Sequence, residues 1–269
     1  MNDTKILTDN NVDLNKSLEL FGDMKTYNQM LEEFLSQVDD KLKEAEKFKN
    51  ISDLVNYEVI VHSLKSDFKY FGAFDTAEVF YKHELAAKEP NPDFINQDFN
   101  HLIEEATRMI NVFKKYMGAD VQVAASNESV PPVQIANTIN GKTIIVVDDS
   151  NIIRTFAEKV FKDEYNVVLA KDGEEAISLV SNSNRDNIMC MLLDLNMPRV
   201  NGFEVLDYFK NNNLFEEVPV SIITGMNDEE TIRKAFAYPI IDMIQKPFSE
   251  EKVRDVTIKT IARKANKGS

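Results

Sequence analysis

Two kinds of hydrophobic pattern divide the chain. Over residues 1–118, apolar residues recur at spacings of three and four, which is typical of amphipathic helices. Gly72 separates two of these helical stretches, and Asn91-Pro92 begins another that ends at Gly118. The pattern predicts an antiparallel all-α helical bundle. Its three longest stripes are Tyr27, Met30, Leu31, Phe34, Leu35, Val38, Leu42 and Ala45; Tyr57, Ile60, Val61, Leu64, Phe68 and Phe71; and Ile95, Phe99, Leu102, Ile103, Ala106, Met109, Ile110 and Phe113.

Residues 142–269 alternate short apolar runs with amphipathic stretches. This alternation is typical of a parallel β-sheet covered by helices, so we predict an α/β, doubly wound, five-stranded parallel sheet. In such sheets, ligands bind at the carboxyl ends of the strands. The predicted strands are residues 143–147, 165–170, 188–193, 218–224 and 242–245, and the predicted helices are residues 150–161, 173–181, 202–210, 229–237 and 249–264.

The stretch between the two patterns, residues 119–141, follows neither of them. It contains Pro131-Pro132 and a strongly polar run at residues 126–129, and both are typical of connecting segments. We therefore expect a multidomain chain, with a bundle at residues 1–118, a linker at 119–141 and a sheet domain at 142–269.

Charge and apolar content restrict the expected partners. With 45 acidic and 31 basic side chains, the net charge of the 269-residue chain is -14, which disfavours binding to nucleic acid. No apolar run approaches the ~18 residues of a membrane span. The first residues also lack the basic and apolar segments of a secretion signal. We expect no nucleic-acid partner, no membrane insertion and a cytoplasmic location.

Polar side chains lie at the end of, or directly after, four of the five predicted strands. Asp148 and Asp149 follow the first strand and Asp194 follows the third, so the fold would bring three carboxylates to one sheet edge. Two like charges ~4 Å apart repel by ~4 kcal/mol at an effective dielectric near 20, so the cluster needs a cation or raised pKa values. Mg2+ suits a site of few oxygen ligands. Thr224, at the end of the fourth strand, and Lys246, after the fifth, would complete a phosphate pocket in which one carboxylate is the nucleophile.

Four motifs in this half carry a resemblance to a known family. In order, the chain has VVDDS at 146–150, LLDLNMPRVNG at 192–202, IITG at 222–225 and QKPF at 245–248. Together they resemble a response-regulator receiver domain, a CheY-like domain with the flavodoxin-like fold, over about residues 142–265. Met243 stands where this family commonly has Tyr or Phe. Two outcomes of phosphorylation therefore stay open, a reshaped surface near the fourth helix or a domain that mainly carries the phosphoryl group.

The resemblance implies a role for each residue of the carboxylate site. Asp194 would accept a phosphoryl group as an acyl phosphate. Thr224 and Lys246 would hold the phosphoryl oxygens and couple the modification to a conformational shift. The Mg2+ ligands would be Asp148, Asp149, Asp194 and the backbone carbonyl of Asn196.

A second candidate site surrounds His62 in the helical half. His62, Lys65, Ser66 and Lys69 are spaced three and four apart, opposite the apolar stripe, so we expect them on a solvent-exposed helix face. An unperturbed imidazole, with a pKa near ~6.5, is substantially neutral at pH 7 and can attack phosphorus. The two ammonium groups would steady the phosphoryl oxygens.

The same segment, HSLKSDFKYFGA at residues 62–73, resembles the histidine phosphotransfer (HPt) domain. That family has His, then Lys three residues on, Gly at four and Gly at ten. His62, Lys65 and Gly72 match, and Ser66 replaces the first glycine. The resemblance implies that His62 becomes a phosphohistidine. His83 and His101 belong to no recognisable motif.

The two resemblances together predict an intermediate of a bacterial two-component phosphorelay. Phosphoryl groups would move between His62 and receiver aspartates, either Asp194 or those of partners. We find no ATP-binding kinase segment or P-loop, so we expect the phosphoryl group to come from a sensor histidine kinase, another receiver or HPt protein, or a small phosphodonor. Two alternatives stay open. One is a phosphorylation-controlled adaptor in which only Asp194 is modified and the bundle is a docking module; the other is an Mg2+-dependent phosphatase.

Overall fold

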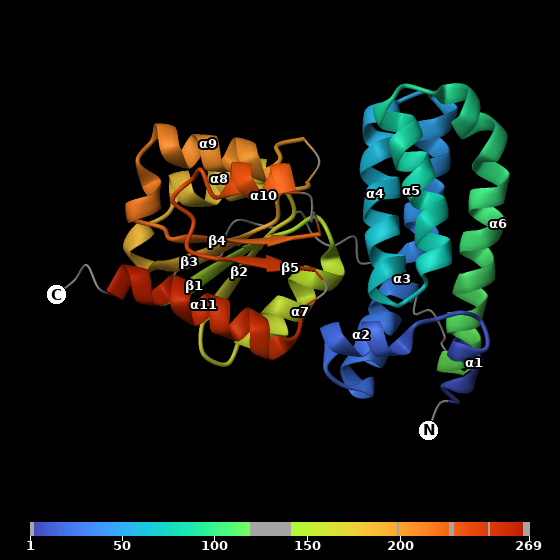
Figure 1. Cartoon of the computed structure of the whole chain (residues 1–269), viewed down its shortest axis with the longest axis horizontal. Coiled ribbons are helices and arrows are strands. Elements are labelled where there is room, and N and C mark those ends of the chain that lie inside the picture. The colour runs from blue at the N-terminus through green and yellow to red at the C-terminus, as the bar shows by residue number, and fades with distance from the viewer. Residues whose placement is uncertain (1–2, 119–140, 198, 226–228, 247, 266–269) are drawn as a thin grey trace. The chain divides into compact units, whose positions relative to one another are not determined.

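The chain divides into two compact units, Met1–Asn127 and Glu128–Ser269. The computed structural model describes residues 3–118, 141–197, 199–225, 229–246 and 248–265 (Figure 1). Apart from Gly141, the predicted linker at residues 119–141 lies outside the described residues. The predicted fold class, a helical region followed by a five-stranded parallel sheet with helices, is confirmed.

The first unit is a four-helix bundle with two short helices before it. In the bundle, α3 packs against α4 and α6, and α5 packs against the same two helices (Figure 1). The helical stretch that follows Gly72 is α5, which continues to Lys88. The elements are α1 (Lys5–Thr8), α2 (Leu14–Phe21), α3 (Met24–Asn50), α4 (Leu54–Tyr70), α5 (Phe74–Lys88) and α6 (Pro92–Met117).

Aromatic side chains fill the centre of this bundle. The ring of Phe71 lies 5.2 Å from that of Phe34, 5.6 Å from that of Tyr27 and 6.0 Å from that of Phe113. Such pairs stabilise a core by about 0.5–1.5 kcal/mol each beyond their buried area. Phe71 directly follows α4, so these contacts anchor the C-terminal end of α4 in the bundle.

The second unit is a parallel sheet with the strand order β2-β1-β3-β4-β5. Figure 1 shows α7 and α11 on one face and α8, α9 and α10 on the other. The strands are β1 (Thr143–Val147), β2 (Asn166–Ala170), β3 (Ile188–Leu193), β4 (Val220–Thr224) and β5 (Met243–Gln245). The helices are α7 (Asn151–Phe161), α8 (Gly173–Asn182), α9 (Gly202–Asn211), α10 (Glu229–Ala235) and α11 (Glu250–Ala265), with single turns η1 (Arg185–Asn187) and η2 (Leu214–Glu216).

The strand register aligns the residues that follow the strands. Val147 of β1 pairs with Leu193 of β3, so the next residue of each strand, an aspartate in both cases, begins at the same level. Thr224 of β4 pairs with Gln245 of β5, which places Lys246 just beyond Thr224. The carboxyl edge of the sheet therefore gathers these side chains, as expected for a doubly wound fold.

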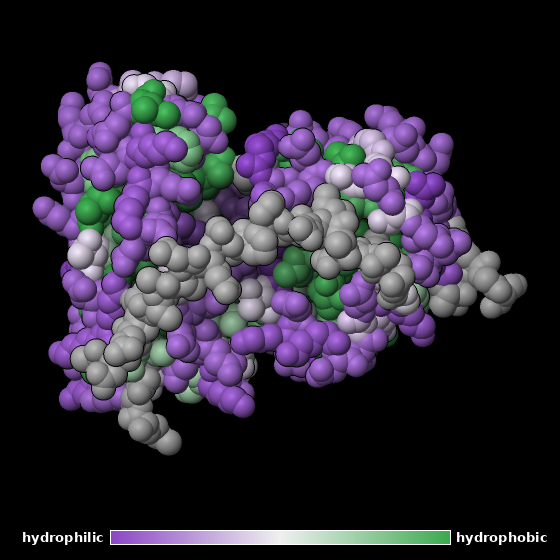
Figure 2. Space-filling view, turned by 180° about the vertical axis from the view of Figure 1, so that it is seen from behind, coloured by the Kyte–Doolittle hydropathy of each residue, from purple (hydrophilic) through white to green (hydrophobic). Residues whose placement is uncertain are grey.

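The surface of the described residues is mostly polar. On the face seen in Figure 2, hydrophilic residues predominate and apolar residues form scattered patches. Within the described ranges, we find no helix with both the length and the apolar character needed to cross a bilayer.

Gly72, which follows α4, provides a test of how the bundle closes. Its φ is +77°, and a Cβ there would lie 2.4 Å from the carbonyl oxygen of Asp13. We expect Gly72→Ala to lower the free energy of unfolding by about 2–4 kcal/mol, because both the backbone conformation and the packing are violated. Gly22→Ala is the matched control, since Gly22 has a φ of +79° but no atom within 4 Å of a Cβ. Its free energy of unfolding should fall by about 1 kcal/mol. Urea denaturation measures both, and equal losses would contradict the close approach of Gly72 to Asp13.

Candidate functional site

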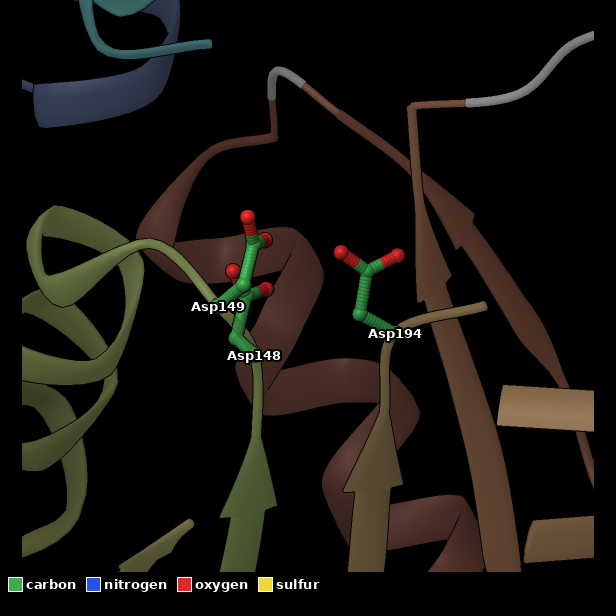
Figure 3. Close-up of side chains that lie close together, drawn as sticks. All are labelled: Asp148, Asp149 and Asp194. Carbon is green, nitrogen blue, oxygen red and sulfur yellow. The ribbon is translucent and has the colours of Figure 1, made fainter. Parts of the chain in front are cut away.

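Three carboxylates meet at the carboxyl edge of the sheet. Asp148 and Asp149 directly follow β1 and Asp194 directly follows β3, and Figure 3 shows their side chains beyond the ends of these two strands. One oxygen from each lies within 4.8 Å of the other two. Asp148 and Asp194 are buried. The structure therefore brings together the three acidic residues that the sequence placed at one site.

Lys246 enters this cluster from the residue after β5. Its Nζ lies 2.6 Å from Asp148 Oδ2 and 2.7 Å from Asp194 Oδ2. Its backbone N–H donates to the carbonyl of Thr224 at 2.7 Å, and Thr224 is itself buried at the end of β4. The predicted hydroxyl and ammonium thus come from neighbouring strands, and the ammonium bridges two carboxylates.

Burial dominates the electrostatics of Asp148. It is the main cause that raises the pKa of Asp148 to about 7; the Lys246 ammonium opposes the rise, whereas the carboxylates of Asp194 and Asp149 add to it. Three carboxylates and one ammonium sum to a charge of -2 when all are ionised. A proton on Asp148 near neutral pH is one way to reduce that charge, and a bound cation is the other.

Backbone groups hold the carboxylates in place. The N–H of Ser150 donates to Asp148 Oδ1 at 3.0 Å, and the N–H of Asn196 donates to Asp194 Oδ1 at 3.2 Å. Arg154, one turn into α7, donates to the carbonyl of Asp148 at 2.5 Å. Sequence reasoning missed Arg154 and the bond from Ser150. Only the position of Ser150, directly after the paired aspartates, could have signalled its role.

The donor set fits Mg2+. All the side-chain ligands are carboxylate oxygens, which hard divalent cations prefer, and their charge exceeds that of the single ammonium. Among the described residues, this is the cluster of acidic groups that could hold a metal ion.

The second site lies between α4 and α5. His62 Nδ1 is 2.9 Å from Glu84 Oε1, and Lys65 Nζ is 2.6 Å from Glu84 Oε2. Lys88, one turn further along α5, donates to Glu84 Oε1 at 2.6 Å. Glu84 is buried, with 2% of its side chain exposed, whereas 13% of His62 and 19% of Lys65 are exposed. The acidic side chain of α5 therefore organises the basic side chains around it.

The ionisation of Glu84 determines which nitrogen of His62 carries a proton. Burial acts to raise the pKa of the Glu84 carboxyl, but the hydrogen bonds and charges of His62 and Lys65 outweigh it and hold that pKa well below its ordinary value. An ionised carboxylate only accepts hydrogen bonds, so Nδ1 of His62 is the donor. In the neutral imidazole, the lone pair then lies on Nε2.

The predicted solvent-exposed face around His62 is wrong in most of its members. Only Lys69 is exposed; His62, Lys65 and Ser66 are half-buried. The physical reason is that α5 packs closely on α4 and covers part of this side of α4. Helical periodicity identified the side of α4 but not what covers it.

Glu84 was not predicted, and its signal in the sequence is weak. It lies 22 residues from His62, in a helix that also carries Glu78, Lys82 and Lys88. The sequence therefore does not distinguish Glu84, which is buried, from the other charged residues of this helix. Neighbouring His83 is fully buried and contacts Tyr57 and Asp98, whereas His101 is exposed.

The raised pKa of Asp148 makes the stability of the metal-free chain depend on pH. Folded Asp148 keeps its proton up to about pH 7, whereas the unfolded residue loses it near 3.8. The folded state binds more protons in this window, so the free energy of unfolding should fall as pH rises from about 4 to 7. Asp148→Asn should remove this fall and be more stable than wild type at pH 8, by on the order of 3 kcal/mol.

Urea denaturation in EDTA at several pH values measures the effect. Asp255→Asn, at an exposed position of the same unit, is the control and should follow the wild-type curve. Parallel pH profiles for wild type and Asp148→Asn would contradict the assignment.

Comparison with known proteins shows what the second unit is similar to. Residues 144–257 match the family model described as the response regulator receiver domain. Over 107 residues the chain is 37% identical to response regulator RR06 of Streptococcus pneumoniae, covering 39% of this chain and 46% of that protein. Over 138 residues it is 31% identical to the CAI-1 autoinducer sensor kinase/phosphatase CqsS of Vibrio cholerae, covering 51% of this chain and 19% of that protein.

Among solved structures, the chemotaxis protein CheY4 of Vibrio cholerae matches 45% of this chain and 99% of its own, with 24% identity and a TM-score of 0.41. The chain spans less than half the length of the two curated relatives named above. Because residues 144–257 match the family model, the second unit of this chain contains a response regulator receiver domain.

Proposed function

We propose that this protein is a phosphorelay intermediate that passes phosphoryl groups between His62 and receiver aspartates, Asp194 or those of partner proteins. A receiver domain implies two-component signalling through phosphorylation of an aspartate. The observation that carries the further step is the partly buried contact between His62 Nδ1 and Glu84 Oε1, at 2.9 Å. It supports a role for the first unit as a histidine phosphotransfer domain.

His62 would be the phosphoryl carrier of the bundle. With its proton on Nδ1 held by Glu84, the lone pair of Nε2 attacks the phosphorus of a phosphodonor, and the N–P bond forms as the donor's bond to phosphorus breaks. The imidazolium that results keeps its proton on Nδ1, where the anionic Glu84 stabilises the positive charge. Lys65 Nζ lies 3.2 Å from Nδ1 but cannot donate to that nitrogen while it carries the proton; its ammonium donates to Glu84 Oε2 at 2.6 Å instead.

Asp194 would accept the phosphoryl group at the sheet edge. One of its carboxylate oxygens forms a bond to phosphorus while the Nε2–P bond of a phosphohistidine breaks, and the bonding pair returns to the imidazole. Lys246, already 2.7 Å from Asp194, would move its contact to the phosphoryl oxygens, and Thr224 would donate its hydroxyl to them. When Mg2+ is bound by Asp148, Asp149, Asp194 and the backbone carbonyl of Asn196, it supplies positive charge opposite the developing phosphoryl charge.

The surface of α5 beside His62 suits a protein partner. Tyr81 and Leu85 lie one turn apart on α5 and are 41% and 39% exposed, although both are large apolar residues. Lys65 Nζ lies 5.7 Å from the centre of the Tyr81 ring, so this apolar surface adjoins the His62 cluster. Sensor histidine kinases, other receivers and HPt proteins are the partner classes that would bring a phosphoryl group to it.

Placement of the label tests the proposal. Full-length wild type, His62→Gln and Asp194→Ala are incubated with Mg2+ and either acetyl phosphate, phosphoramidate or a phosphorylated receiver. We expect a base-labile acyl phosphate that is lost in Asp194→Ala, and an acid-labile, base-stable label that is lost in His62→Gln. His101→Gln, at an exposed histidine of the same unit, should keep both labels.

A different pattern would favour the adaptor. Label on Asp194 alone, with every donor, would contradict the relay and favour a phosphorylation-controlled binding protein whose bundle is a docking module. The partial burial of His62, with 13% of its side chain exposed, is the observation that favours this second candidate.

A further inference from the structure

The loop between Asp194 and α9 is fastened to the turn that precedes α8. The guanidinium of Arg199 donates to Asp172 Oδ2, and the N–H of Gly173 donates to the carbonyl of Val200 at 3.0 Å. Two consecutive loop residues thus contact two consecutive turn residues, one pair through side chains and one through the backbone. The loop that begins after Asp194 is therefore anchored, near its other end, to the connection between β2 and α8.

The loop packs closely against neighbouring backbone at two points. A Cβ on Gly173 would lie 2.5 Å from the carbonyl oxygen of Val200, and a Cβ on Gly202 would lie 2.2 Å from the carbonyl oxygen of Asp194. The N–H of Gly202 also donates to the carbonyl of Leu195 at 3.0 Å. Small displacements of the loop would therefore be transmitted to the backbone of Asp194.

Asp172 has two separate tasks in this arrangement. Its Oδ1 accepts from the N–H of Glu175 at 2.9 Å and caps α8, while its Oδ2 accepts from Arg199. The side chain of Asp172 is 2% exposed and that of Arg199 is 49% exposed. A carboxylate so deeply buried needs a cationic partner, and the structure supplies one from the loop.

Arg199 holds a backbone conformation that arginine disfavours. Its φ is +63°, in the left-handed region where glycine carries no steric penalty. The ion pair with Asp172 opposes that penalty. A glycine would adopt this φ without strain, so any stabilisation of the loop by Arg199 comes from its side chain.

We propose that Arg199 and Asp172 form a positioning pair that holds the loop carrying Asn196 in the conformation that Mg2+ requires. The inference rests on the magnesium site of the proposed function. Asn196 lies three residues before Arg199, its N–H donates to Asp194 Oδ1 at 3.2 Å, and its carbonyl is the backbone ligand assigned to the metal. Neither Arg199 nor Asp172 is among the residues assigned above to the metal or to the phosphoryl pocket, so the pair acts through the loop.

Magnesium titration of the full-length chain by calorimetry tests the pair. The variants are Arg199→Gly, which relieves the backbone penalty and removes the guanidinium, and Asp172→Asn, whose amide oxygen still caps α8. We expect each to weaken Mg2+ binding about tenfold and the double variant to weaken it no further, because the two residues act together. Arg185→Ala is the control. It breaks the ion pair of Arg185 with Glu217 at the opposite end of β3 and should leave Mg2+ binding unchanged.

A second readout separates positioning from general stability. In EDTA, the Gly173 amide of Arg199→Gly should exchange with deuterium faster than in wild type, by a larger factor than the loss of its free energy of unfolding in urea accounts for. Unchanged Mg2+ affinity together with unchanged Gly173 exchange would overturn the proposal, as would a loss of stability with unchanged Mg2+ affinity. If wild type binds no Mg2+, the magnesium site of the proposed function is contradicted. In that case, unchanged deuterium exchange at Gly173 in metal-free Arg199→Gly would also contradict the positioning role of Arg199 and Asp172.

Discussion

The burial of carboxylate charge is the constraint on which both units depend. Removing an ionised carboxylate from water costs several kcal/mol unless cations and hydrogen-bond donors compensate it. Glu84 in the bundle and Asp148 at the sheet edge are both almost completely buried. Each lies within 2.6 Å of a lysine ammonium, Lys65 in one case and Lys246 in the other. The arrangement of the surrounding side chains follows from this need.

The two sites satisfy the constraint in opposite ways. Glu84 is one carboxylate surrounded by His62, Lys65 and Lys88, so its pKa falls and it remains an anion. At the sheet edge, three carboxylates share one ammonium, and the pKa of Asp148 rises to about 7, chiefly through burial. The first arrangement suits a fixed anion that orients an imidazole. The second is a site with excess negative charge, which suits a cation and a phosphoryl group whose arrival changes the balance.

Sequence patterns predicted the fold and the clustering of the aspartates at the sheet edge, because local periodicity and the general topology of parallel sheets determine both. Periodicity identifies strands and helices, and the topology of a parallel sheet brings Asp148 and Asp194 together from neighbouring strands. The environment of His62 could not be predicted in the same way. Its partner Glu84 comes from another helix, and the rotation of α5 against α4 depends on the packing of the whole core. The contact of Arg199 with Asp172 joins two loops and likewise leaves no periodic signal.

The central claim is that Glu84 makes Nε2 of His62 the phosphoryl acceptor. Phosphorus and nitrogen NMR of the phosphorylated chain, with 15N-labelled histidine, tests it most directly, because coupling between 31P and 15N identifies the nitrogen that is bonded to phosphorus. We expect a single phosphohistidine, at Nε2 of His62. A phosphoryl group on Nδ1, or on another histidine while His62 stays unmodified, would contradict the account.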